Sequence, residues 1–433
     1  MKFHAERDAL TLELHERPFQ SMRAPLRVSH MAVGTGEQGG ERDHQQLCAL
    51  CRHFGKPEPQ SGVKHFISDL GPFVVKWERH TEFSSYNFQR SEPFESPFEE
   101  TVLDLLPKDW LRNLFGEVMV AMHASVGGDR ATDIDPNRLS RWFGGNEVFA
   151  NTIDGLPADV YSDLRTHDDG FERLMIRTDG SLDPVLLGQL VQRVLEAMTY
   201  ARLALLSLPI ARANSTRLAK VERGLSDVAR ALASELSHGQ EETQLEKLST
   251  LSAELEDVVA SSSFRYAASN AYYELVQNRL SDLNPGQIDG RIDLFGYLMR
   301  RVNPAMRTCQ AFATRQEALS RRANRLSSLL QTGIEVRLEA QNGELLKSMN
   351  RRAEQAIRLQ RTVEGLSIVA VSYYALSLIK ILFDGLEKSG SLPISASVAT
   401  AVLMPVVILG LWLTLRLVTR RLLRTEDGGG GHG

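Results

Sequence analysis

Cysteines are few in this sequence, and a secretory leader is missing. The 433 residues include only Cys48, Cys51 and Cys309, too few for a disulfide framework and typical of a protein in a reducing compartment. The first residues, MKFHAERDALTLELHERPF, contain no apolar core beside a cleavage site, unlike a secretory signal. We therefore expect the bulk of the chain to lie in the cytosol.

Charge of one sign is not in excess, and the usual catalytic signatures are absent. Lys and Arg total 50 against 54 Asp and Glu, a net charge of −4, so no overall basic surface predicts nucleic-acid binding. The sequence contains no HExxH, no HxH and no nucleophile elbow. GGD (127–129) and FGGNE (143–147) match neither a Walker loop nor a dinucleotide fingerprint. We predict no catalytic site, no metal site and no enzyme activity, and the sequence indicates no cofactor.

Two long apolar runs stand near the C-terminus. Residues 365–386 would form a helix of about 33 Å, enough for the hydrocarbon core of a bilayer. The second run, 389–415, carries no charge, and we predict a second transmembrane helix over 393–415, where neighbouring groups compensate for Pro405. Only DGLEKSG separates the runs, so they form a tight transmembrane hairpin.

Arginines beside both runs predict the direction of this hairpin. Four precede the first run and four follow the second: Arg351, Arg352, Arg358, Arg361, Arg416, Arg420, Arg421 and Arg424. Such clusters are retained on the cytoplasmic side. We expect a multi-pass membrane protein, with the N-terminal domain and the C-terminus cytoplasmic and the short loop outside.

Lys380 and Asp384 are the two charges inside the first run. The simpler interpretation is a lysine that reaches the outer interface and pairs with the aspartate one turn on. Alternatively, helical spacing places five residues on one stripe: Ala370, Tyr373, Ser377, Lys380 and Asp384. A polar stripe prefers a pore or bundle interior to lipid. The two apolar helices of one chain cannot enclose it, so this hypothesis requires a homo-oligomer.

The middle of the chain has the periodicity of long helices. We predict a helical hairpin region over 181–290, with a cap at Ser181 or Asp183 and a turn at SHGQ (237–240). A long stalk helix over 291–364 follows the break at NPGQIDG (284–290). Apolar seams in this helix suit a coiled coil or partner helices. The stalk is therefore structural, or alternatively transmits a conformational change to the first run.

Residues 1–180 read as an α+β domain with a mainly antiparallel sheet. Segments such as APLRVSHMAV and PFVVKWERH have strand character, and GERDHQQLCALCRHFG that of a helix. The single CALC pair (Cys48 and Cys51) is read as ordinary helix cysteines, because a structural zinc site wants four ligands. Nine of the 11 histidines lie here. Their spacing favours surface or packing roles, although Glu78, His80 and Glu82 would share one face of a continuous strand.

Four separated blocks carry a resemblance: LHERPFQSMRAPLRVSHMAV, DLGPFVVKWERHTEFSSYNF, ALLSLPIARAN and RLQRTVEGLSIVAVSYYA. Together they resemble a bacterial family of uncharacterised membrane-anchored proteins, which implies membrane attachment but no known active site. In layout alone the chain is similar to CorA-type divalent-cation channels. The Gly-Met-Asn signature of those channels is replaced by FDGLEKSG.

The expected architecture is an α+β cytosolic domain, a long helical stalk with a coiled-coil-like hairpin, a two-helix transmembrane hairpin and a basic, then Gly-rich, tail over 416–433. The first hypothesis for function is a membrane-anchored homo-oligomer whose copies associate through the stalk and transmembrane helices, and its sharper form adds a cation path. One alternative is a tethered cytosolic scaffold or sensor without transport activity. Another is a tethered metal-dependent enzyme built from the N-terminal histidines.

Overall fold

The computed structural model describes residues 3–7, 10–11, 19–36, 39–130, 132, 134–234, 240–388 and 394–426, the last 12 of these by backbone alone. The chain divides into two compact units, Met1–Ser328 and Leu329–Gly433. Each unit is described by itself below.

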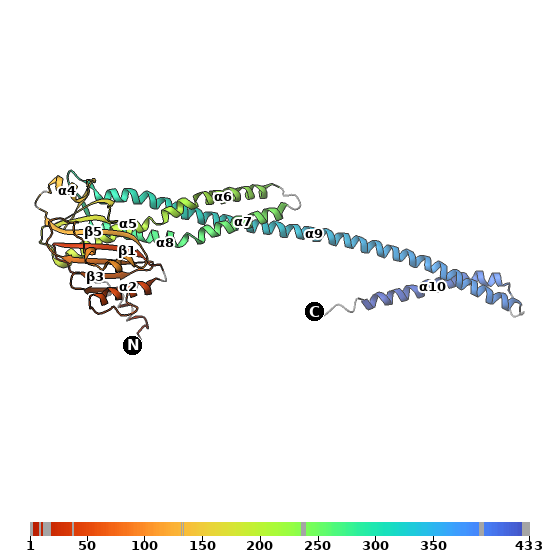
Figure 1. The fold of residues 1–433 in the computed structure, drawn as a ribbon. Helices are drawn as coiled ribbons and strands as arrows, with labels where there is room; N and C mark the ends of the chain where they lie inside the picture. Colours follow the sequence, from red (N-terminus) through yellow and green to blue (C-terminus); the bar gives the residue numbers. More distant parts are fainter. Residues whose placement is uncertain are drawn as a thin grey trace. The chain divides into compact units, whose positions relative to one another are not determined.

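One sheet organises the first unit (Figure 1). Its described strands are β1 (Leu26–Gly34), β2 (His65–Asp69), β3 (Val74–Arg79), β4 (Phe83–Ser91), β5 (Glu117–Asp129), β6 (Phe149–Ile153), β7 (Ala158–Thr166), β8 (Glu172–Thr178), β9 (Pro285–Gln287) and β10 (Ile292–Asp293). The strand order is β10-β6-β7-β8-β5-β1-β4-β3-β2, with β9 also paired to β6. Pairs β5–β8 and β6–β10 are parallel and the others antiparallel. The predicted mainly antiparallel sheet is confirmed.

The described helices are α2 (Gly40–His53), a 3₁₀ turn (Val102–Leu105), α3 (Lys108–Arg112), α4 (Pro136–Trp142), α5 (Pro184–Ala204), α6 (Ser207–Ala233), α7 (Gln240–Ala260), α8 (Ser263–Leu283), α9 (Leu294–Lys388) and α10 (Ala396–Glu426). Asp183 caps α5, accepting hydrogen bonds from the backbone N–H of Val185 at 2.8 Å and of Leu186 at 3.4 Å. Of the two caps that the sequence allowed, the chain uses this one.

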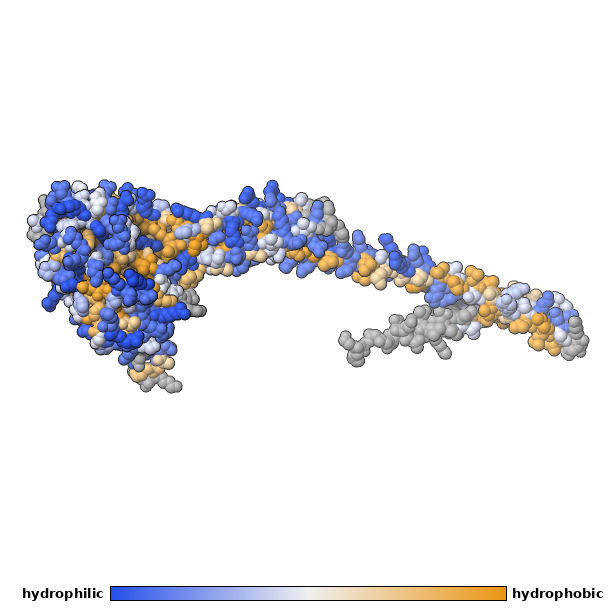
Figure 2. Space-filling model, in the orientation of Figure 1, coloured by the Kyte–Doolittle hydropathy of each residue, from blue (hydrophilic) through white to orange (hydrophobic). Residues whose placement is uncertain are grey.

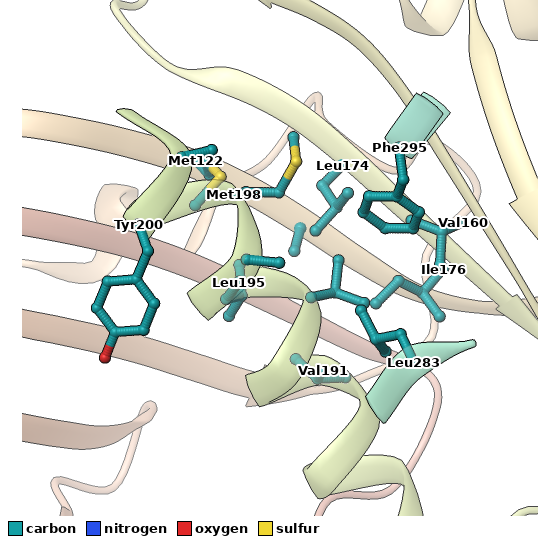
Figure 3. Packing of buried hydrophobic residues seen from close by; sticks show 14 of the residues in the cluster. Met122, Val160, Leu174, Ile176, Val191, Leu195, Met198, Tyr200, Leu283 and Phe295 are labelled. Atoms are coloured by element: carbon teal, nitrogen blue, oxygen red, sulfur yellow. The ribbon is translucent and has the colours of Figure 1, made fainter. Parts of the chain in front are cut away.

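Helix α5 covers one face of the sheet. Strand alternation turns Val28 and Ala32 of β1 toward it. Figure 3 shows Val191, Leu195 and Met198 of α5 among side chains of the sheet and of the two helices α8 and α9, all in one core. The labelled partners are Met122, Val160, Leu174, Ile176, Leu283 and Phe295. This core fixes α5 and α8 on the sheet, because apolar burial is the main favourable term in folding.

Helix α2 covers the opposite face. Met31 and Val33, the alternate residues of β1, belong to this second core. Asp43 of α2 is fully buried, and its carboxylate accepts hydrogen bonds from Trp77 Nε1 at 2.8 Å and from the Tyr86 hydroxyl at 2.5 Å. Burial and the neighbouring Asp43 raise the pKa of Tyr86, so its hydroxyl remains a donor. The carboxylate therefore ties α2 to the sheet.

Helices α6 and α7 form a third core with the early part of α9. Leu218, Leu225 and Val228 of α6 lie in one cluster with Leu248 and Leu255 of α7. A side chain on Gly224 would come within 2.7 Å of Leu251, so this close approach of helices requires glycine. The predicted hairpin is present, although most of its SHGQ turn lies outside the described residues.

Three details differ from the sequence predictions. The segment 284–290, predicted as a break between helices, contains strand β9, which pairs with β6. Strand β2 was not predicted. Within the helical region predicted over 181–290, the part after the SHGQ turn is interrupted near Ser262, between α7 and α8. The strand through His80 is not continuous, because β3 ends at Arg79 and β4 begins at Phe83. The condition for Glu78, His80 and Glu82 to share one strand face is therefore not met, although Glu78 and His80 line the same cavity.

The second unit contains the rest of α9 and helix α10. Three described helical stretches are long and apolar enough to cross a membrane, namely Pro184–Ala233, Leu294–Glu387 and Ser397–Thr414. Their most apolar windows are 61%, 6% and 0% buried, respectively. Figure 2 shows hydrophobic side chains at the surface of the last part of α9. The first stretch is thus core of the sheet unit, whereas the other two expose their apolar side chains.

Candidate functional site

A cavity of about 40 Å³, lined by both polar and apolar side chains, lies between the sheet and α5. His30 of β1 and Asn87 of β4 line it from the sheet, and Gln192, Glu196 and Thr199 line it from α5. The helical residues are spaced by four and three, so they share one stripe of α5. The volume suits a few water molecules or a small ion.

His30 is hydrogen-bonded at both ring nitrogens. Nδ1 lies 2.7 Å from Asn87 Oδ1, and Nε2 lies 2.9 Å from Thr199 Oγ1. Burial, which disfavours the charged imidazolium, lowers the pKa of His30 to about 4. The ring is therefore neutral at pH 7, with Nδ1–H donating to Asn87 and Nε2 accepting from the Thr199 hydroxyl. It is placed to orient neighbouring groups rather than to exchange protons.

A chain of charged and polar side chains crosses the same cavity. Lys76 Nζ lies 3.3 Å from Glu78 Oε1 and donates a hydrogen bond to Gln192 Oε1 at 3.0 Å. Gln192 Nε2 in turn donates to Glu196 Oε1 at 2.7 Å, and Glu196 forms an ion pair with Arg279 of α8. Two cations and two carboxylates alternate along this path, so the buried charges balance.

A second link joins the β3–β4 turn to α8. Glu82 accepts a hydrogen bond from the Tyr272 hydroxyl at 2.6 Å and pairs with Arg265 at 2.8 Å. Burial and Glu82 raise the pKa of Tyr272 well above its ordinary value. The next residue, Tyr273, donates to Asn303 of α9 at 2.9 Å. Sheet, α8 and α9 are therefore connected by neighbouring polar contacts.

The predicted histidine groupings do not assemble a metal site in the described residues, where no set of three His, Cys, Asp or Glu side chains could hold an ion. His80 stacks on Phe83 with ring centroids 4.2 Å apart. His65 is paired with Glu78 in the register of β2 and β3. Cys48 and Cys51 are free and buried in α2, and burial raises the pKa of Cys51 to about 11.

A Ser-His-Asp arrangement that was not predicted from the sequence lies on the α2 side of the sheet. Ser29 Oγ lies 2.9 Å from His123 Nδ1, and His123 Nε2 lies 3.8 Å from Asp169 Oδ2. Burial lowers the pKa of His123 to about 4. Ser29 is only 1% exposed, so its hydroxyl is out of reach of a substrate. The group joins β1, β5 and the β7–β8 loop, and only the strand register brings it together.

The stripe proposed for the first apolar run lies on one helix, as its spacing requires. Tyr373 is 69% exposed and Lys380 is exposed, whereas Ser377 and Asp384 are half-buried. All four arginines before the run are exposed on α9: Arg351, Arg352, Arg358 and Arg361. The side chains of Arg416, Arg420, Arg421 and Arg424 and the tail from 427 lie outside the described residues.

The family model described as "Protein of unknown function (DUF3422)" matches residues 2–422. The chain belongs to the DUF3422 family. No curated protein and no solved structure matches it. The resemblance to an uncharacterised family is confirmed, and the similarity in layout to CorA-type channels has no support from a relative. The family description assigns no activity to its members.

Proposed function

We propose that this DUF3422 protein is a two-span membrane anchor of the bacterial cytoplasmic membrane, with the sheet unit in the cytosol. The observation that carries the proposal is the contrast in burial among the three described helical stretches that are apolar enough to cross a membrane. The window in Pro184–Ala233 is 61% buried, while those of α9 and α10 are 6% and 0% buried. Exposed apolar surface of this extent needs a cover in water, and a bilayer supplies one.

The direction of the spans follows from arginine. The cluster from Arg351 to Arg361 precedes the first span, and a second cluster follows the other span in the sequence. Moving several arginines across a bilayer is costly, so both ends stay inside. The N-terminal unit and the C-terminus are then cytoplasmic, with the spans at 365–386 and 393–415.

We further propose a homo-oligomer in which the first spans face one another through the stripe. Tyr373 is 69% exposed, and Ser377, Lys380 and Asp384 follow it at helical spacing. Contact with a second copy removes these polar groups from lipid. A cation path along the stripe is the second candidate function, favoured by the same polar side chains.

An anchored sensor or scaffold is the other candidate, favoured by the polar links of the sheet unit. Lys76, Gln192 and Glu196 connect β3 to α5, Arg279 carries the link to α8, and Tyr273 reaches Asn303 of α9. In this function the spans act only as a tether. Replacing residues 365–415 by an unrelated hairpin of equal length then preserves the protein's cellular role.

Two experiments separate these possibilities. Washing membranes at alkaline pH tests the anchor: the protein stays in the pellet if it spans the bilayer and is released if it does not. Flux into liposomes tests the conduit: a flux that responds to Lys380→Ala or Asp384→Ala supports it, and the absence of any flux refutes it while leaving the anchor intact.

A further inference from the structure

The part of α9 in the second unit carries a regular seam. Beginning at Leu338, its positions are separated alternately by four and three residues: Leu338, Asn342, Leu345, Met349, Arg352, Ala356, Leu359, Val363, Leu366 and Ala370. The mean spacing of 3.5 is that of the a and d positions of a left-handed coiled coil, whereas the face of an isolated helix repeats every 3.6 residues. Two helices wound around each other would bury this seam.

The seam is uncovered in a single chain. Leu345 is 60%, Leu359 69% and Leu366 70% exposed. In the first unit, by contrast, Leu326 of the same helix is 7% exposed within the core shared with α6 and α7. A row of leucines on a water-exposed helix indicates a partner surface.

The residues that flank the seam suit a second copy of the same helix. Between 341 and 367 the e and g positions carry no charge: Gln341, Leu346, Ser348, Ala353, Gln355, Gln360, Thr362 and Ser367. The charges of this segment lie at outer positions instead, except for Arg352: Glu344, Lys347, Arg351, Glu354, Arg358, Arg361 and Glu364. Apart from the two Arg352 side chains, no like charges therefore meet when two identical helices pair in parallel.

We propose that α9 pairs with α9 of a second copy as a parallel, in-register, two-stranded coiled coil from Leu338 to Ala370. This proposal rests on the proposed membrane anchor, because two copies inserted in the same direction hold their α9 helices parallel and at one depth. Leucine at four of the five d positions and asparagine at one a position favour two strands. Asn342 then hydrogen-bonds its own counterpart and sets the register.

The same spacing continues into the first span. Ala370, Tyr373, Ser377, Lys380 and Asp384 prolong the a and d positions without a skip. In the parallel pair, Lys380 of one chain is the diagonal neighbour of Asp384 of the other. Two lysines and two aspartates then neutralise each other away from lipid. The coiled coil and the polar stripe are one continuous contact.

Cysteine cross-linking of the full-length protein in native membranes tests this contact. Leu345→Cys and Leu359→Cys lie in the seam, and Lys347→Cys and Arg361→Cys on the outer face are matched controls. Ala356→Cys is a further seam variant that removes no large side chain. The three native cysteines are buried. The unsubstituted protein measures how much disulfide-linked dimer they form by themselves. After mild oxidation, the seam variants yield several-fold more disulfide-linked dimer than the controls.

Equal linkage at seam and outer positions would overturn the coiled coil. Light scattering of the detergent-solubilised protein gives two chains per particle; three or more would overturn the two-stranded arrangement. The alkaline wash distinguishes failure of the coiled coil from failure of the membrane anchor. Protein that stays in the pellet without periodic cross-linking refutes the coiled coil alone. Protein that washes off refutes the anchor, and cross-linking of the released protein still decides whether the helices pair.

Discussion

The ammonium group of Lys76 donates a hydrogen bond to Gln192 Oε1 at 3.0 Å and so joins β3 to α5 across the cavity between the sheet and this helix. The same group lies 3.3 Å from Glu78, and the two side chains are only 3% and 9% exposed. A buried carboxylate that loses its cation is left charged in a poorly solvated place. The charge balance beside the cavity therefore depends on Lys76.

Lys76→Met should destabilise the sheet unit by about 3–5 kcal/mol, because Glu78 loses its buried partner. The double change Lys76→Met with Glu78→Leu should recover most of this loss, since an apolar pair replaces the ion pair. Denaturant unfolding of the detergent-solubilised protein, followed by tryptophan fluorescence, measures both effects. Lys108→Ala, a change of an exposed lysine, is the control. An equal, small effect of Lys76→Met and Lys108→Ala would contradict this role.

The pH dependence of stability should report the neutral state of His30. Its pKa in the folded protein is lowered to about 4, so between this value and about 6.5 the unfolded chain binds more protons. Stability due to this group is therefore lost as the pH falls, by about 2 kcal/mol between pH 7 and pH 5. His30→Gln should remove that part of the slope, whereas His53→Gln, at an exposed site, should leave it. An unchanged slope in His30→Gln would show that another group is responsible.

Asn342 should determine how many chains associate. A single asparagine at an a position favours two strands at a cost in stability. Asn342→Leu is therefore expected to strengthen association while allowing particles of three or four chains. Light scattering in detergent measures the number of chains, and Asn350→Leu at an outer position is the matched control. If both variants remain pure dimers, the asparagine does not select the two-stranded state.

Arg352 is the one charged residue at a or d positions between Leu338 and Ala370. Two guanidinium groups approach each other at this layer of the pair, so Arg352→Leu should make the dimer more resistant to dissociation on dilution. Arg351→Leu removes an equal charge from the outer face and should have little effect. If Arg352→Leu instead weakens the dimer, Arg352 does not lie in the seam.

The sequence predicted those parts of the fold that depend on local patterns. Seven strands with period-two alternation, α2 and the long α9 are present. Strand β9 has only three residues, and its place depends on Asn151 of β6. The Asn151 amide donates to the carbonyl of Gly286 at 2.7 Å and its Oδ1 accepts from the N–H of Phe295 at 3.0 Å. Such long-range pairing leaves no periodic signal.

The candidate site was less predictable than the fold, for the same reason. His30, Lys76 and Gln192 come from three segments far apart in the sequence, and only strand register and the docking of α5 bring them together. The shared strand face considered for Glu78, His80 and Glu82 required a continuous strand, and a turn interrupts that strand between Arg79 and Phe83. The stripe from Ala370 to Asp384 could be recognised, because it depends only on spacing within one helix.

The central claim is that the chain crosses the membrane twice and leaves both ends in the cytosol. A reporter fused after Gly433, together with single cysteines in the loop between the two spans, tests this most directly in whole cells. The account predicts that an impermeant thiol reagent labels Glu387→Cys from outside and that the C-terminal reporter is active only in the cytosol. A reporter accessible from outside, or release of the protein at alkaline pH, would contradict it.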